Sequence, residues 1–115
     1  MQEEQSQMEM LEISLNTAKE RVAKMESLNN LVKNEDFINI IDTGYFKEEA
    51  SNVVLLLATP GHADEASQKR IMKNIDSIGF LRQYFSGIIQ LGMQAHKAIK
   101  DHEEMKDELI AEGEV

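Results

Sequence analysis

The chain has 115 residues, a net charge of −9 at pH 7 and no cysteine, and its size suits a single domain spanning residues 1–115. The lack of cysteine excludes disulfides, thiolate metal sites and cysteine nucleophiles, and it fits the reducing environment of a cytoplasm. The longest apolar run, Val53 to Ala58, is far too short to cross a membrane as a helix, so we expect a cytoplasmic protein.

The first predicted helix covers residues 8–33. Its apolar residues recur in alternating steps of three and four, which is the spacing of a heptad seam. This pattern suits a coiled coil between copies and a helix packed within its own domain equally well. Asn29 falls on a seam position, where it either selects the register of a coiled coil or marks the fraying end of the helix. The predicted oligomer or partner interface is this seam: Met8, Leu11, Leu15, Val22, Met25 and Asn29.

Two short helices are predicted within residues 35–58. Asn34 is the expected N-cap of the first, with acidic residues in the first turn that suit the positive end of the helix dipole. Gly44 is expected to stop that helix, and the second then follows up to Ala58. The sequence Thr59-Pro-Gly-His62 predicts a break in the chain, and Asp64 is the expected N-cap of the next helix.

The last predicted helix covers residues 64–109. A main apolar stripe lies on one face, and a second stripe of Phe80, Tyr84 and Leu91 predicts burial on two sides. So long a helix is expected to kink or to project beyond a compact domain. Glycines in it are either kink sites or points of close helix approach, and Gly87 and Gly92 fit both interpretations. Roughly residues 1–6 and 111–115 are expected to be disordered.

Together these segments predict an all-α fold, a helical hairpin or small bundle with a long N-terminal helix, two short helices and a long C-terminal helix. The short helices are expected to pack as a cap around four aromatic residues, Phe37, Phe46, Phe80 and Phe85. The heptad seam and the two stripes offer more apolar surface than one small chain can cover, so we expect a homo-oligomer.

Charge is distributed unevenly along the chain. Residues 1–12 hold four acids and no base, and residues 101–115 hold seven acids and one base. These ends sum to −4 and −6, which leaves +1 for residues 13–100. No basic stripe exists to displace the counterions of a nucleic acid, so we expect neither direct nucleic-acid binding nor an anionic membrane surface as a partner.

No motif in the sequence carries chemistry. A Gly-rich phosphate loop is missing, and no serine lies in the strand–turn–helix setting of a catalytic nucleophile. His96 and His102 are six residues apart, about 240° around a helix, so they cannot share a metal ion from one face. The sequence therefore predicts no enzyme, no catalytic residues, no cofactor and no metal site.

Several packing motifs resemble those of short uncharacterised helical proteins of tailed bacteriophages. They are Asn34-Glu-Asp-Phe37, Tyr45-Phe-Lys-Glu-Glu-Ala50, Ile75-Asp-Ser-Ile78 and Leu81-Arg-Gln-Tyr-Phe85, within roughly residues 20–104. The resemblance implies a phage protein of the host cytoplasm or the virion, with itself and another phage or host protein as partners. We expect a non-enzymatic assembly component. The alternative is an acidic inhibitor that binds a basic surface of a host enzyme as a partial DNA mimic.

Overall fold

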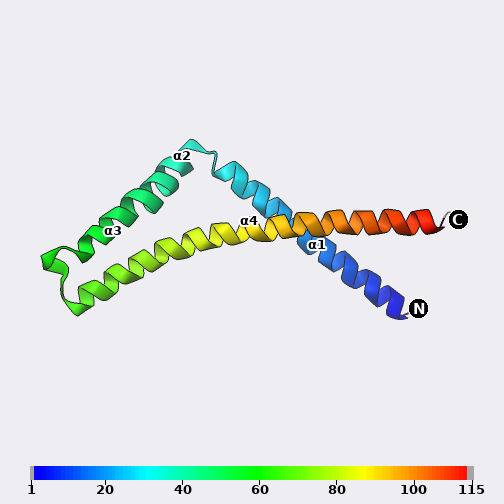
Figure 1. Ribbon diagram of the computed structural model, residues 1–115, viewed down its shortest axis with the longest axis horizontal. Coiled ribbons are helices and arrows are strands. Elements are labelled where there is room, and N and C mark those ends of the chain that lie inside the picture. The colour runs from blue at the N-terminus through cyan, green and yellow to red at the C-terminus, as the bar shows by residue number, and fades with distance from the viewer. Residues whose placement is uncertain (1, 114–115) are drawn as a thin grey trace. The chain divides into compact units, whose positions relative to one another are not determined.

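The computed structural model describes residues 2–113, and it describes their side chains except those of residues 3–5, 7, 8, 11 and 13. Residues 2–113 contain helices and no strand, which confirms the predicted all-α fold with a long helix at the start and another at the end (Figure 1). The chain forms two compact units. Unit 1 combines residues 1–28 with 88–115, and unit 2 consists of residues 29–87.

The two long helices extend further than the sequence predicts. Helix α1 spans Gln2–Leu31 and helix α4 spans Glu65–Gly113. Strong helix formers (Gln, Glu, Met, Leu, Lys) dominate both segments, so the backbone gains from remaining helical. Residues 2–6 and 111–113, within the ends that were expected to be disordered, are therefore helical, whereas residues 1, 114 and 115 lie outside the described range.

Between the long helices, three helical segments follow one another directly: α2 (Glu35–Phe37), the π-helical η1 (Ile38–Glu49) and α3 (Ala50–Leu57). Asn34 is the predicted N-cap, because its side-chain oxygen accepts hydrogen bonds from the backbone N–H groups of Asp36 (2.9 Å) and Phe37 (3.1 Å). The predicted stop at Gly44 is wrong. No glycine has a positive φ, whereas a glycine that ends a helix usually adopts that left-handed conformation.

The predicted break after Ala58 is confirmed as a short turn with a 3-10 helix, η2 (Pro60–His62). Thr59, which precedes the proline, is extended, as the proline ring requires of its neighbour. The Gln68 side chain then donates to the carbonyl oxygens of His62 (2.7 Å) and Leu57 (3.5 Å). These bonds tie the turn to the first turns of α4.

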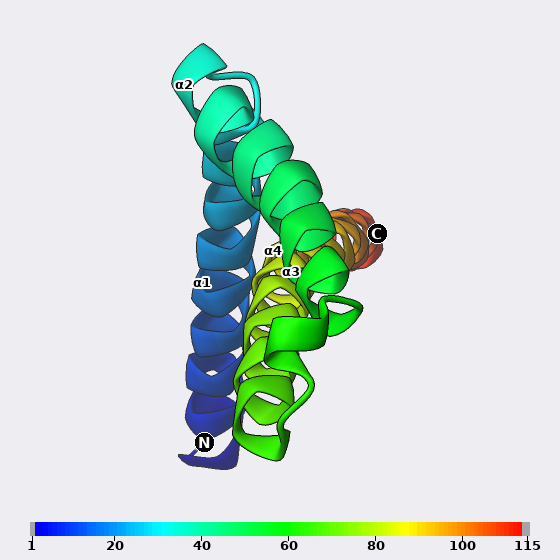
Figure 2. The ribbon, with the colours of Figure 1, turned by 90° about the vertical axis from the view of Figure 1, so that its left-hand side faces the viewer.

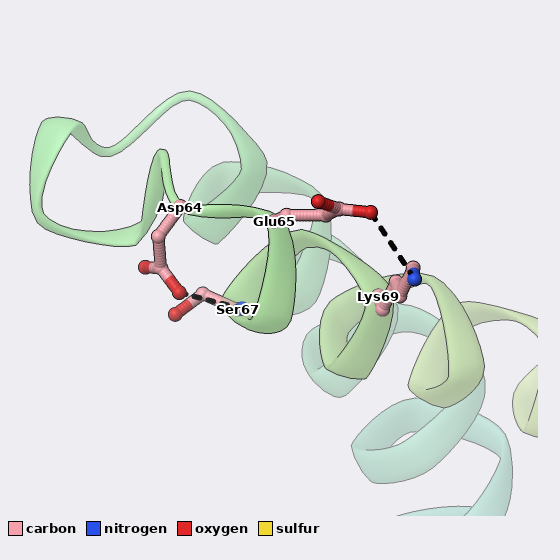
Figure 3. Close-up of polar contacts among 4 residues, drawn as sticks. All are labelled: Asp64, Glu65, Ser67 and Lys69. Atoms are coloured by element: carbon pink, nitrogen blue, oxygen red, sulfur yellow. Dashed lines mark hydrogen bonds and ion pairs between the residues drawn. The ribbon is translucent and has the colours of Figure 1, made fainter.

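Asp64 caps α4, as the sequence predicts (Figure 3). Its carboxylate accepts a hydrogen bond from the backbone N–H of Ser67 at 3.0 Å. The pKa of Asp64 lies below its usual value of 3.8, because the Ser67 hydroxyl and then the Ser67 backbone N–H donate to the charged form. One turn later, Lys69 Nζ lies 3.2 Å from Glu65 Oε1 in an exposed ion pair.

The Asp64 cap predicts a pH dependence of stability. A lowered pKa in the folded state means that the carboxylate stabilises the fold above the unfolded pKa, and that this contribution is lost as the pH falls through the folded pKa. Asp64→Asn keeps a capping side chain but cannot titrate. We therefore expect Tm to fall more between about pH 5 and pH 3 in the native chain than in Asp64→Asn, as measured by circular dichroism. Identical slopes would contradict this account of the cap.

In unit 1, α1 crosses the second half of α4 (Figure 1), and small residues lie at the contact. Ala18 and Ala95 are buried, and Gly92 is buried directly against the Met25 side chain. A Cβ atom at Gly92 would meet the Cβ of Met25 and lie only 2.7 Å from its Sδ atom. Gly92 is therefore a point of close helix approach, whereas nothing lies within 4 Å of a Cβ placed on Gly87.

In unit 2, α3 runs beside the first half of α4 (Figure 2), and the core contains Val53, Ile71 and Ile78. The Phe85 ring lies at the centre of the predicted aromatic cluster, 5.9 Å from Phe37 and 6.0 Å from Phe46 between ring centroids. The expected fourth member, Phe80, is 67% exposed instead. It lies five residues before Phe85 on the helix. This corresponds to a rotation of about 140° around the axis after one full turn, so the Phe80 side chain faces away from η1.

Candidate interaction surface

The seam predicted on α1 is only partly available to a partner. Leu15, Val22 and Met25 are half-buried, and Asn29 is exposed in the last turn of the helix. Leu15 and Ala18 line a cavity together with Ala98, Ile99 and His102 of α4, all within unit 1. The side chains of Met8 and Leu11 lie outside the described residues. The middle of the seam thus packs within its own chain, which was one of the two arrangements that the heptad pattern allowed.

The second apolar stripe of α4 is exposed, which corrects the predicted burial on two sides. Phe80, Tyr84 and Leu91 are 67%, 54% and 44% exposed. The physical reason is that each half of α4 packs against other helices on one side only, and Phe80 and Tyr84 lie on the opposite face from the buried Ile71 and Ile78. Sequence reasoning therefore placed the side chains of Phe80, Tyr84 and Leu91 wrongly.

A second exposed apolar patch lies on α3. Val54 and Leu55 are 54% and 66% exposed. They border an open groove that continues to Phe46 and Lys47 of η1. The Arg82 guanidinium lies over the Phe46 ring at 5.7 Å, a cation–π contact that covers part of the apolar surface next to the groove. This patch has exposed apolar side chains and a cationic rim.

The charges of α4 differ in sign between its two halves. In unit 2, residues 65–87 carry four basic and two acidic side chains, a net of +2. In unit 1, residues 88–113 carry three basic and six acidic side chains, a net of −3. The acids are concentrated at the end, because residues 101–113 hold all six of them and one base. An electrostatic gradient along one helix favours partners with complementary halves.

Within residues 2–113, no group of three or more His, Asp or Glu side chains lies close enough together to hold a metal ion. No helix in this range is both long enough and apolar enough to cross a membrane. The candidate interaction surface consists of the exposed apolar side chains of α3 and α4 with their charged neighbours.

Comparison with protein-family models found no match for the chain, and searches among curated proteins and among solved structures found no similar protein.

Proposed function

We propose that the chain is a non-enzymatic protein-interaction component that acts as a homo-oligomer in virion assembly. The observation that carries this proposal is the ratio of exposed to buried apolar side chains. Few large apolar side chains are buried among the described residues, namely Leu28, Val53, Ile71 and Ile78. Among the described side chains, fifteen large apolar ones are at least 37% exposed, far more than the scattered apolar residues expected on the surface of a protein that works alone.

Both compact units leave apolar side chains exposed. In unit 1, Leu91 and Met93 are 44% and 64% exposed, and in unit 2, Val54 and Leu55 are 54% and 66% exposed. Association of several copies would bury apolar area that unit 1 and unit 2 each leave exposed.

The resemblance of the packing motifs to those of short helical phage proteins favours the assembly role. If the proposal is right, mass spectrometry should find the chain in purified particles or in assembly intermediates from infected cells, at many copies per particle. A particle protein of known copy number serves as the reference. Absence from both fractions would contradict the assembly role, whatever the oligomeric state of the purified chain.

A second candidate is the acidic inhibitor, favoured by the six exposed acids in residues 101–113. An inhibitor of this kind mimics the charge of DNA, so duplex DNA should displace it from its target, and salt should weaken the complex. An assembly component should resist DNA competition. The near-neutral body of the chain, +1 over residues 13–100, favours assembly, because a DNA mimic spreads negative charge over its whole surface.

A further inference from the structure

We propose that η1 is a conformational switch within unit 2, a π-helical segment that changes to an α-helix when Phe37 and Phe46 leave Phe85. The change turns α3 about its own axis and exchanges the face that α3 buries. This switch goes beyond the proposed function, because it needs no second copy. Three features carry the proposal: the spacing of half-buried side chains, the surroundings of Gly44, and the apolar side chains on both faces of α3.

The π-helical winding of η1 places two aromatic rings on one side. Phe37 and Phe46 are nine residues apart, yet their ring centroids lie 5.9 Å and 6.0 Å from that of Phe85. Nine residues of an α-helix make about two and a half turns, which would put the two rings on opposite sides. Each hydrogen bond of a π-helix reaches one residue further, so more residues fit into a turn and nine residues make about two turns. The π-helix therefore lets both rings contact Phe85.

A series of half-buried side chains follows the same winding. Its members are separated by steps of four, five and four residues, and they are Phe37, Ile41, Phe46 and Ala50. This spacing is longer than the period of about 3.6 residues in an α-helix. Ile40, outside the series, is 68% exposed. After Ala50 the next buried or half-buried residues, Val53 and Leu57, follow in steps of three and four, which is the α-helical spacing. The contacts of unit 2 thus match a π-helix in η1 and an α-helix in α3.

Gly44 permits this π-helix. A Cβ atom on residue 44 would lie 2.8 Å from the backbone oxygen of Asn39, five residues earlier in the same segment. That distance is closer than packed atoms approach one another, so the backbone of η1 accepts glycine at this position. An α-helix, in contrast, accepts alanine and prefers it to glycine. Since π-helices longer than one turn are rare, η1 depends on Gly44 and on the contacts with Phe85, and without them the α-helix is favoured.

Helix α3 has apolar side chains on opposite faces. Val53 is 2% exposed and Leu55 is 66% exposed, and the two lie about 200° apart around the helix. If η1 becomes an α-helix, nine residues make about two and a half turns instead of about two, so α3 turns by about half a turn. Leu55 then takes the place of Val53 in the core of unit 2, and cores tolerate an exchange between apolar side chains of similar size. The exposed face of α3 is the buried face of the second state.

The absence of cysteine allows a direct test by thiol labelling of the full chain. Val53→Cys reports the buried face of α3, and Leu55→Cys reports the exposed face. A buried thiol reacts with a maleimide only when its surroundings open, so Leu55→Cys should react faster than Val53→Cys by about tenfold or more. Labelling at nanomolar concentration keeps a second copy from covering either side chain.

Gly44→Ala should reverse this order. The substitution adds the Cβ that the π-helix excludes and keeps Phe85, so it favours the α-helical state of η1. Val53→Cys should then react about tenfold faster than before, and Leu55→Cys should react more slowly. Phe85→Ala should have the same effect, because it removes the ring that both Phe37 and Phe46 contact.

Gly79→Ala is the matched control in the same unit. It makes the same chemical change in a helix, but nothing lies within 4 Å of a Cβ at this position. Gly79→Ala should therefore leave the labelling rates of Val53→Cys and Leu55→Cys unchanged.

Two results would overturn the inference. The first is an unchanged rate for both cysteines in Gly44→Ala, which would mean that η1 has no second state for Gly44 to hold back. The second is fast labelling of both cysteines in Gly44→Ala and in Phe85→Ala, because unit 2 then loses its core instead of exchanging one face of α3 for the other. Faster labelling of Val53→Cys together with slower labelling of Leu55→Cys is the result that supports the switch.

Discussion

Phe85→Ala is expected to lower the free energy of unfolding by about 2–3 kcal/mol. The Phe85 ring contacts Phe37 of α2 and Phe46 of η1, so it joins the chain segment before α3 to the first half of α4. Unit 2 buries few other large side chains, with Val53, Ile71 and Ile78 in its core. Removing the ring leaves a cavity where α2, η1 and α4 meet.

The measurement is urea unfolding followed by circular dichroism, at one fixed protein concentration so that association contributes equally. Phe85→Leu is the matched control, since it retains most of the volume and loses the ring contacts, and it should cost less than half as much as Phe85→Ala. Equal stability of Phe85→Ala and the native chain would show that the aromatic cluster does not hold unit 2 together.

Gly92→Ala is expected to destabilise unit 1 even though alanine is the better helix former. The substitution gains about 1 kcal/mol of helix propensity, but the added Cβ would collide with the Cβ of Met25 and lie 2.9 Å from its Cγ. The Met25 Cβ is fixed to the backbone of α1, so the helices must separate, at a cost of about 1–3 kcal/mol. The net effect is a loss of stability.

Gly79→Ala, on the same helix, is expected to have the opposite effect on stability. Nothing lies within 4 Å of a Cβ at Gly79, so this variant should gain about 0.5–1 kcal/mol from helix propensity alone. Thermal unfolding at equal concentration measures both variants. If Gly92→Ala proved as stable as Gly79→Ala, the close packing of α1 on α4 would be refuted.

Local signals in the sequence predicted much of the fold. Asn34 and Asp64 cap helices as expected, because a capping side chain acts on backbone groups two or three residues away. The break around Pro60 was predictable for the same reason. Gly44 was not, because glycine permits a left-handed turn but does not impose one, and the chain continues through it in right-handed conformation.

The candidate surface was harder to predict, since periodicity shows that a face is apolar and does not show what covers it. The heptad seam of α1 and the second stripe of α4 have equally regular spacing. The first packs in part against its own chain at Leu15 and Met25, whereas the second is exposed at Phe80 and Leu91. In unit 1, Gly92, Ala95 and Ala18 let α1 approach α4 closely. In unit 2, Phe80 lies about 200° around the helix from the buried Ile78, so the contacts of α4 leave its ring exposed.

The measurement that tests the central claim most directly is the molar mass of the full chain by light scattering at micromolar concentration. The exposed apolar side chains of α3 and α4, among them Leu55 and Phe80, predict a mass of at least twice 13.1 kDa, falling on dilution as copies separate. A mass of 13.1 kDa over the whole micromolar range would contradict the account, because the exposed apolar side chains would then remain in water without a second copy to cover them.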